Sequence, residues 1–435
     1  MDNEAQRVSG AVPEEKALTA LALLSLIGGA MTGLIVATFR IVLQWADHAR
    51  DAMVGWAHKE SVLGFLVVFA IVTIAGGVAA WLVRRFSPRA TGSGIPHVEA
   101  VLRGEIPSAP VRLILVKYIG GFLAIGAGFA LGREGPSVQM GAIVSHFLGS
   151  VFRRASEDCS ALLAAGAGAG LATAFNAPIA GAVFVLEELV RRFDLRITIA
   201  TLGASAGAIG VSRVFLGESP DFTVPELPYL GLGTVPIHLV LGVLAGLLGV
   251  AYNRCIVAGL GFGRKLNRVP VEVRAGSIGA LIAVLAWVDH SIVGGGDSIT
   301  QGVLSGRDML AGILVCFLIR FAVGPLSYAA ETPGGLFAPM LVLGAQLGYM
   351  FGVVCCFLHP HFGADPVADA VVGMAAFFTG VVRAPVTGIV LAIELTGSFT
   401  LFLPMLAACF TAMLVPTLLK EAPIYESLKD FLGDQ

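Results

Sequence analysis

The chain has 435 residues, of which 56% are apolar and only 13% are charged, and its mean hydropathy is +0.85. Soluble domains carry about 25% charged residues, so the composition excludes disorder, a coiled coil and a disulfide-rich secreted scaffold. The net charge of −2 provides no basic surface for nucleic acid. The apolar residues form long continuous runs instead of alternating with polar ones, which favours an all-α polytopic membrane protein over a β-barrel.

A polar tail at 1–16 precedes the first apolar run, which is too long for the core of a cleavable signal, so we interpret it as a retained helix. A bilayer core of ~30 Å requires about 20 helical residues to cross it. Runs of suitable length lie at 17–46, 62–83, 111–131, 159–190, 197–216, 231–260, 276–293, 309–330, 335–358, 367–395 and 401–419. Several of them contain Gly or Pro and are long for one span, which indicates broken and re-entrant helices.

The two halves of the chain share a pattern at an offset of about 203–207 residues. The segments that align are Gly132-Arg133-Glu134-Gly135-Pro136 with Gly335-Leu336-Phe337-Ala338-Pro339, Lys117 with Arg320, Ala177-Pro178 and Glu187 with Ala384-Pro385 and Glu394, and, more weakly, Gly92–Ile95 with Gly295–Ile299. Short Gly/Pro-interrupted segments at matching places in two halves indicate a transporter-type site near the membrane midplane.

Basic residues orient the chain, because loops rich in Lys and Arg stay in the cytosol. They cluster at Arg84–Arg89, Arg153–Arg154, Arg191–Arg196 and Arg264–Arg268. By contrast, the segments 218–226 and 359–369 contain no Lys or Arg. The alternation predicts that both termini lie in the cytosol.

Repeat and orientation together predict five parts. They are a cytosolic N-terminal tail (1–16), a first membrane repeat (17–216), an extracytoplasmic linker (217–230), a second membrane repeat (231–420) and a short cytosolic C-terminal tail (421–435).

The Gly/Pro patches predict an anion site. Each patch opens a helix, and the first N–H groups of a helix lack an intrahelical partner. The resulting partial charge, roughly +0.5 at each helix start, suits an anion. Several such helix starts can hold an anion without a fully charged Lys or Arg, which would bind it too tightly for release.

Three segments carry the candidate chemistry. Glu134 lies between apolar stretches, where an acid is a functional hypothesis by default, and its carboxylate can compete with the anion and carry a proton. The alternative for Glu134 is a surface ion pair with Arg133. Ser93 lies between two glycines and can donate its hydroxyl to an anion, or it belongs to an ordinary turn. The segment 334–339 offers backbone N–H donors, or is a packing turn.

Two further positions have open interpretations. Glu187 and Glu188 end a long apolar run just before Arg191 and Arg192, so they are either inner proton acids or a solvated helix end. Tyr425 follows the last run, and from the residues alone it is interpreted as an aromatic residue of the membrane interface.

Together these motifs resemble the CLC family of chloride channels and proton-coupled chloride transporters. The motifs are Gly-Ser-Gly-Ile-Pro at 92–96, Gly-Arg-Glu-Gly-Pro at 132–136, Gly-Leu-Phe-Ala-Pro at 335–339 and Phe-Asn-Ala-Pro at 175–178. The resemblance extends over about 20–430 and is strongest to bacterial exchangers without cytosolic regulatory domains. It implies an inverted-repeat fold with tilted, broken and re-entrant helices. It also implies a homodimer with one pathway per subunit, in the bacterial inner membrane.

The resemblance also implies roles for individual residues. Chloride would contact the hydroxyls of Ser93 and Tyr425 and the backbone amides of Leu336 and Phe337. That role replaces the interfacial interpretation of Tyr425.

The proton residues follow from the same resemblance. Glu134 matches the gating glutamate, which competes with chloride and passes protons to the outer side, and Glu188 matches the internal glutamate of exchangers. The sequence departs from the family at His97, where a Glu is frequent, although Glu99 keeps an acid nearby. This departure concerns the inner proton route.

We therefore predict a secondary active antiporter that exchanges chloride for protons. The alternative is a passive chloride-selective channel of the same fold. An intramembrane enzyme that uses Glu134 as a general acid or base is a third hypothesis, but the sequence offers it no nucleophile or metal set. We expect no cofactor, no metal and no nucleic-acid partner; chloride is the bound substrate, and the lipid bilayer is the surroundings.

Overall fold

A computed structural model describes residues 14–228, 230–266, 268–306, 310–358 and 364–433. Within these ranges the chain consists of helices and connecting segments, with two isolated β-bridges and no strand. The predicted all-α class is thereby confirmed. Most of the predicted N-terminal tail, and part of the segment 359–369, lie outside the described residues.

The first half contains α1 (Glu14–Ala57), α2 (Ser61–Phe86), α3 (Ile95–Leu102), α4 (Arg112–Gly126), α5 (Glu134–Val151), α6 (Ser156–Phe175), α7 (Pro178–Phe184), the π-helical segment η3 (Val185–Leu189) and α8 (Leu195–Leu216). The second half contains α9 (Val235–Lys265), α10 (Val271–Val288), α11 (Asp297–Leu304), α12 (Leu310–Tyr328), α13 (Phe337–Leu358), α14 (Pro366–Val382), α15 (Pro385–Thr396), α16 (Phe402–Leu418) and α17 (Ile424–Gly433). Short 3₁₀ turns are η1 (His58–Glu60), η2 (Pro88–Ala90), η4 (Leu232–Thr234) and η5 (His290–Ile292).

The two longest broken runs break at matching places. The run at 159–190 divides into α6 and α7, and the run at 367–395 divides into α14 and α15. At each break a residue adopts a left-handed backbone, with φ of 51° at Asn176 and 71° at Arg383, and Ala-Pro follows. Proline cannot continue a helix from within but fits its first turn, so it starts the next helix in a new direction.

Four helices were not predicted from the apolar runs of the sequence. α5 is absent from the predicted apolar runs, because polar side chains such as Ser137 and Gln139 interrupt its sequence although they are buried. The helices α3 and α11 are too short to appear as spans, with 8 residues each. The terminal helix α17 is amphipathic and follows the last run.

The order of helices in the second half repeats that of the first. Each half has two long helices, a short helix that begins after a left-handed glycine, and then five further helices, and the second half adds the terminal helix α17. The short helices begin after Gly94 (φ 81°) and Gly296 (φ 97°), and Gly92 (φ 59°) corresponds to Gly294 (φ 80°). The predicted pairing of Gly92 with Gly295 was therefore wrong by one residue, because both loops are Gly-rich and only the backbone angles fix the register.

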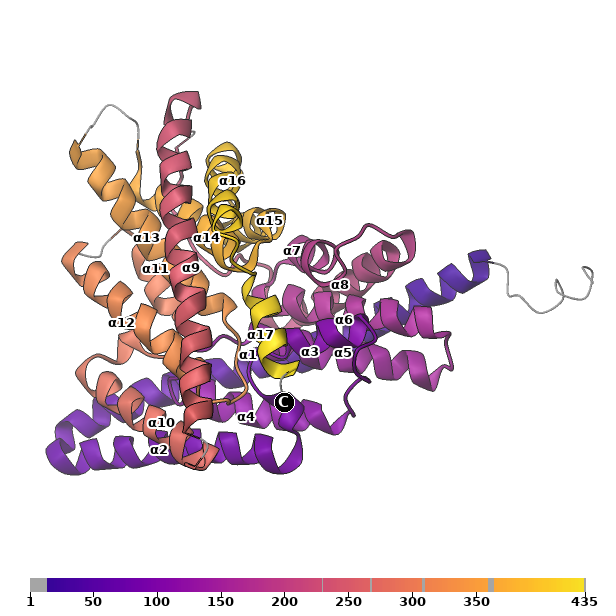
Figure 1. The fold of residues 1–435 in the computed structure, drawn as a ribbon, viewed down its shortest axis with the longest axis horizontal. Coiled ribbons are helices and arrows are strands. Elements are labelled where there is room, and N and C mark those ends of the chain that lie inside the picture. The colour runs from indigo at the N-terminus through magenta and orange to yellow at the C-terminus, as the bar shows by residue number, and fades with distance from the viewer. Residues whose placement is uncertain (1–13, 229, 267, 307–309, 359–363, 434–435) are drawn as a thin grey trace, which may run out of the picture.

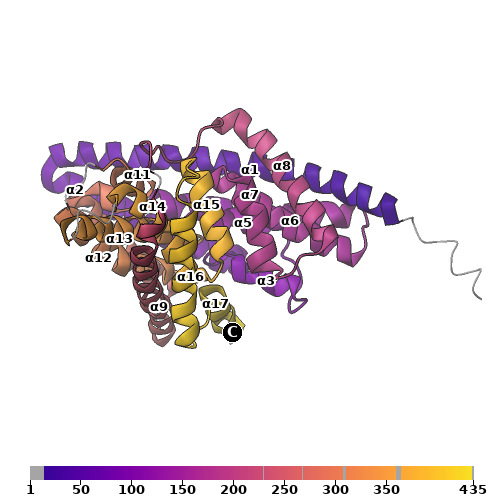
Figure 2. The ribbon, with the colours of Figure 1, turned by 90° about the horizontal axis from the view of Figure 1, so that it is seen from above.

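Equivalent helices also pack on equivalent partners. α5 packs along α6 and α13 along α14, while α1 packs along α8 and α9 along α16. Glycines bring these helices close, since a Cβ on Gly344 would lie 2.5 Å from the carbonyl oxygen of Gly373. Figures 1 and 2 show that α1 crosses the whole molecule and that α3 and α17 lie side by side, near the centre of the view in Figure 1 and at the lower edge in Figure 2.

The outer faces of the helices are apolar. Among the described residues, seven helical stretches are long and apolar enough to cross a membrane, and exposed Leu, Val and Phe side chains cover their outward faces. Exposed apolar surface of this extent is stable in lipid and not in water. The protein is an integral, multi-pass membrane protein.

Candidate anion site and its two acids

The loop before α3 is built around a buried lysine. Lys117 of α4 is fully buried, and its Nζ donates to the carbonyl oxygens of Ala90 (3.0 Å) and Gly92 (2.7 Å). A buried ammonium requires acceptors, and these carbonyl groups supply them. Lys117 thus fixes the curved backbone that presents Ser93.

Ser93 is fully buried at the start of α3. Its Oγ accepts a hydrogen bond from the N–H of Ile95 (3.3 Å), and its own N–H donates to the hydroxyl of Tyr328 (3.4 Å). The Oγ hydrogen remains available as a donor to a bound anion. Sequence reasoning did not find Tyr328, which lies 235 residues away in the chain.

Arg320 of α12 performs the same task in the second half. Its guanidinium donates to the carbonyl oxygens of Ile292 (3.1 Å), Gly294 (2.6 Å) and Gly295 (2.9 Å). The sequence pairing of Lys117 with Arg320 therefore has a physical meaning. Each cation holds the Gly-rich loop that starts a short helix.

The starts of α5 and α13 meet in the middle of the molecule. Gly132 and Gly335 exchange backbone hydrogen bonds, with N···O distances of 2.8 and 2.6 Å. Ser93 lies against the same place, since a Cβ on Gly135 would come within 2.6 Å of the Ser93 Cβ. Three segments that the sequence singled out separately are thus in contact.

Glu134 points its carboxylate at the start of α13. The side chain is fully buried, its Oε2 accepts from the N–H of Ala338 (3.4 Å), and its Oε1 has no hydrogen-bond partner within the described residues. The alternative of a surface ion pair with Arg133 was wrong, because Arg133 binds Asp297 and Asp221 instead. A carboxylate therefore occupies a helix start of the kind that binds anions.

Tyr425 and Phe337 complete the surroundings of this carboxylate. Both side chains are fully buried, as is Leu336, and the Tyr425 ring stacks on the Phe337 ring at 6.2 Å between centroids. The Tyr425 hydroxyl has no hydrogen-bond partner among the residues that the structure describes. Burying a hydroxyl without a partner is unfavourable, and the hydrogen of this hydroxyl is free to be donated.

Glu188 is the second buried acid. It lies in η3 with 3% of its surface exposed, and Oε1 is 3.4 Å from the Arg191 guanidinium. Glu99 of α3, also buried, is an electrostatic neighbour. Glu188 borders a cavity of about 420 Å³, which Arg383 and Pro423 also line. A solvated helix end is therefore the wrong description of Glu188.

Glu187 has a different task from its neighbour. Its carboxylate accepts from the N–H groups of Val386 (3.0 Å) and Thr387 (2.7 Å) at the start of α15. Glu394, its counterpart in the second half, accepts from the N–H groups of Ile179 (3.1 Å) and Ala180 (2.7 Å) at the start of α7. Each helix thus caps the beginning of the other, which requires them to run antiparallel about a twofold relation.

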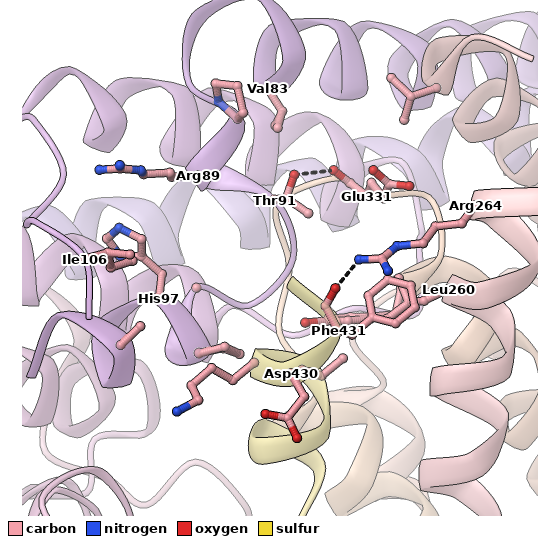
Figure 3. Close-up of a pocket in the computed structure, with 18 of the residues that line it drawn as sticks. Val83, Arg89, Thr91, His97, Ile106, Leu260, Arg264, Glu331, Asp430 and Phe431 are labelled. Atoms are coloured by element: carbon pink, nitrogen blue, oxygen red, sulfur yellow. Dashed lines mark hydrogen bonds between the residues drawn. The ribbon is translucent and has the colours of Figure 1, made fainter. Parts of the chain in front are cut away.

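A cavity of about 870 Å³ lies beside the loop that carries Ser93. Figure 3 shows Arg89 and His97 on one side of it, and Arg264 stacked on Phe431 on the other. Both ring nitrogens of His97 are buried without a hydrogen-bond partner among the described residues. None of the residues that line this cavity also lines the cavity at Glu188. The loop that carries Ser93 borders the larger cavity through Thr91 and Gly94, and Glu188 borders a separate one.

Comparison with known proteins gives the family. The profile described as Voltage gated chloride channel matches residues 75–417. The chain belongs to the CLC family.

CLC relatives match over nearly the whole chain. The H(+)/Cl(−) exchange transporter ClcA of Salmonella arizonae is 34% identical over 424 residues, which are 96% of this chain and 89% of that protein. ClcA of Salmonella paratyphi B is 34% identical over 95% of this chain and 89% of its own length.

Solved CLC structures share the fold. The crystal structure of a slow cyanobacterial Cl−/H+ antiporter superposes with a TM-score of 0.90 at 29% identity and covers 95% of this chain and 97% of that one. A CLC-type fluoride/proton antiporter superposes with a TM-score of 0.81 at 23% identity, covering 96% and 99%, and shows the fold alone.

The CLC sequence motifs did not reveal a group of charges beside Glu134. Arg40 of α1, Arg133, Asp221 and Asp297 form a continuous network of ion pairs. Asp221 lies in the segment that the sequence identified only as an acidic linker. Its partners are 181 and 88 residues away, so no local pattern could have signalled it.

Proposed function

We propose that the protein is a secondary active transporter that exchanges chloride for protons across the membrane. The observation that carries this proposal is the placement of the Glu134 carboxylate at the backbone amide of Ala338, at the start of α13. A carboxylate in that position occupies the site where an anion would bind. Protonation neutralises the carboxylate, so it leaves the site and chloride can bind there. One side chain then links the binding of chloride to the movement of a proton.

Chloride binds, in this proposal, between Ser93, Tyr425 and the amides of Leu336 and Phe337. The support is that all four residues are buried and that both hydroxyl groups have an uncommitted hydrogen. No Lys or Arg side chain is needed at the anion, since Lys117 and Arg320 bind backbone carbonyl groups. Partial charges hold the anion loosely enough for turnover.

Protons reach Glu134 from the inner side through Glu188. Its burial and its separate cavity support a proton route that diverges from the chloride route on the inner side. A passive channel of the same fold is the second candidate. The exchanger is favoured because relatives 34% identical are named as exchange transporters and because an internal acid is present at position 188.

The proposed organisation follows the two halves. Residues 17–216 and 231–420 form the membrane repeats, joined by an extracytoplasmic linker at 217–230, with 1–16 and 421–435 in the cytosol of a bacterial cell. Membership of the CLC family supports a homodimer with one pathway per subunit, and α7, α8, α15 and α16 offer a face with exposed apolar side chains, such as Ile179 and Phe410, for it. The exchange uses no cofactor in this scheme and catalyses no bond rearrangement.

The experiment is a proton-uptake measurement. Purified protein is reconstituted into liposomes loaded with chloride and placed in weakly buffered, low-chloride medium with a pH electrode. Chloride leaving the vesicles should drive protons inward, even against a pH gradient, and an uncoupler should collapse the gradient. Chloride efflux without proton uptake would establish the channel, and no efflux of either kind would refute both candidates.

A further inference from the structure

Arg133 precedes the gating acid but points away from it. Its guanidinium donates to Asp297 Oδ2 (2.7 Å) and Asp221 Oδ2 (3.4 Å), and its Nε donates to the carbonyl oxygen of Ala174 (3.1 Å). These contacts tie the start of α5 to the start of α11, to the segment between α8 and α9, and to the end of α6. Three elements thus hold one side chain.

Asp221 connects Arg133 to a second arginine. Its Oδ1 accepts from Arg40 of α1 at 2.8 Å, and Arg40 also donates to the carbonyl oxygen of Thr173 at 3.0 Å. Both arginines therefore lie at the C-terminal end of α6, where free carbonyl groups favour positive charge. The two arginines and the two aspartates balance in charge.

The segment that carries Asp221 is fixed to the protein at neighbouring residues as well. The carbonyl oxygen of Ser219 accepts from Asn176 (3.0 Å), and the N–H of Phe222 donates to the carbonyl oxygen of Leu395 (2.9 Å). Thr223 exchanges two hydrogen bonds with Gln301 of α11. Asp221 is therefore held in place independently of the arginines, and it can act as a fixed counter-charge.

The arrangement keeps the guanidinium off the neighbouring carboxylate. Glu134 and Arg133 are adjacent in sequence, and at low dielectric a free guanidinium so close would stabilise the ionised acid strongly. A permanently ionised Glu134 would stay on the amides of α13 and would neither take up a proton nor yield to chloride. Exchange therefore requires that Arg133 has other partners.

We propose that Asp221 and Asp297 are positioning residues that hold Arg133 outward, so that Glu134 can alternate between the anion site and the protonated state. The inference rests on the proposed exchange function and assigns to it two residues outside the chloride site. Arg133 and Asp297 themselves act on the charge of Glu134, Tyr425 on α17 is a further titratable neighbour, and Arg40 on α1 joins the network through Asp221. Asp297→Asn leaves Tyr425 in place and leaves Arg40 with its Asp221 partner.

The test uses Asp297→Asn in the full chain, reconstituted into liposomes. The Asp297 side chain is 47% exposed, so the substitution should leave the fold intact. We expect exchange to slow, and the external pH for half-maximal exchange to fall by about one unit, which corresponds to one tenfold step in proton concentration. Asp289→Asn, an exposed acid eight residues earlier outside the network, is the matched control and should behave as the unaltered protein.

A double variant separates positioning from structure. In a Glu134→Ala background there is no acid to position, so Asp297→Asn should leave the chloride flux unchanged. If Asp297→Asn lowers chloride flux equally in both backgrounds, the residue is merely structural and the inference is overturned. An unchanged pH profile in the single variant overturns it as well. Failure of the unaltered protein to exchange would instead refute the proposed function.

Asp221→Asn provides a second variant with the same expected direction. Its effect should be smaller, because the Arg133–Asp221 distance of 3.4 Å is longer than the Arg133–Asp297 distance of 2.7 Å. A larger pH shift for Asp221→Asn than for Asp297→Asn would contradict the proposed order of contacts. Detergent-solubilised samples that elute as single species establish that both variants are folded.

Discussion

The two halves of the molecule share a backbone frame but differ in the side chains that this frame presents. Lys117 and Arg320 hold equivalent loops, and Glu187 and Glu394 cap equivalent helices. These residues maintain the shape of each half. A side chain of the same type is expected at equivalent positions of both halves where its role is to hold the backbone in shape.

The side chains with a proposed role in transport are not repeated. Ser93 corresponds to Gly295, Glu134 to Phe337, and Glu188 to Leu395. Both proposed proton acids therefore belong to the first half, while the second half contributes amides and an aromatic ring. The duplicated backbone therefore provides equivalent helix N-termini in both halves. Individual side chains that differ between the halves provide the proposed anion and proton contacts.

Replacing Glu134 by Ala tests the comparison most severely, because position 134 then lacks a titratable side chain, as does its counterpart Phe337. We expect proton flux to fall to the background of protein-free vesicles while chloride flux persists, since no carboxylate then competes for the site. The pH electrode and a chloride electrode measure the two fluxes together. Coupling that survives in this variant would remove Glu134 from its proposed role.

Glu188→Gln is expected to have the next largest effect. Proton flux should fall by about tenfold or more while chloride still moves, because the amide cannot release a proton. Glu187→Gln is the matched control one residue away, and its proton-to-chloride ratio should stay unchanged because the Glu187 carboxylate is a helix cap. Loss of coupling in the control, but not in Glu188→Gln, would reverse the two assignments.

Ser93→Ala removes the hydroxyl that the second half lacks. A hydrogen bond to a charged group contributes about 1.5–3 kcal/mol, so the dissociation constant for chloride should rise about tenfold or more. Titration calorimetry with chloride measures this change. An affinity equal to that of the unaltered protein would exclude the Ser93 hydroxyl as a ligand.

Much of this comparison can be recognised in the sequence. The alignment of Lys117 with Arg320 and of Glu187 with Glu394 locates the repeat, because Gly and Pro mark the loops and charged residues are rare in apolar surroundings. The apolar neighbours of Glu134 also favour its burial, whereas the burial of Glu188 stayed open in the sequence because Arg191 and Arg192 follow it closely. Family resemblance, and not the residues themselves, assigned Tyr425 to the site.

Contacts between distant segments could not be predicted. Tyr328 reaches Ser93 across 235 residues, and Asp221 reaches Arg40 across 181. Charge along the chain suggested an Arg133–Glu134 pair, because sequence adjacency says nothing about which way two side chains point. The register of Gly92 against Gly294 also required backbone angles, since runs of glycine align equally well at several offsets.

Glu394→Gln should affect stability rather than transport. It weakens the cap on α7, which we expect to lower the free energy of unfolding by about 1–2 kcal/mol. Denaturant unfolding in detergent measures that loss, and Glu187→Gln should lose about 1 kcal/mol more, because Glu187 also accepts a hydrogen bond from the Thr387 hydroxyl at 2.7 Å. A changed proton-to-chloride ratio in Glu394→Gln would contradict a purely structural role.

The smallest effect is expected for Gly295→Ser, which gives the second loop the residue of the first. A Cβ there would meet nothing closer than the carbonyl oxygen of Leu131 at 3.7 Å, so the variant should fold. Transport rate, chloride affinity and stoichiometry should all equal those of the unaltered protein. A gain in chloride affinity would mean that the second loop also faces the anion.

The proposed anion site takes its contacts from residues between 93 and 425, which has a consequence for biosynthesis. A nascent chain that has inserted only its first half already contains both proposed proton acids but lacks the α13 amides and the Tyr425 phenol. The partly synthesised protein therefore lacks a complete pathway for chloride. Membrane insertion can therefore proceed without an ion leak that would discharge the cell during translation.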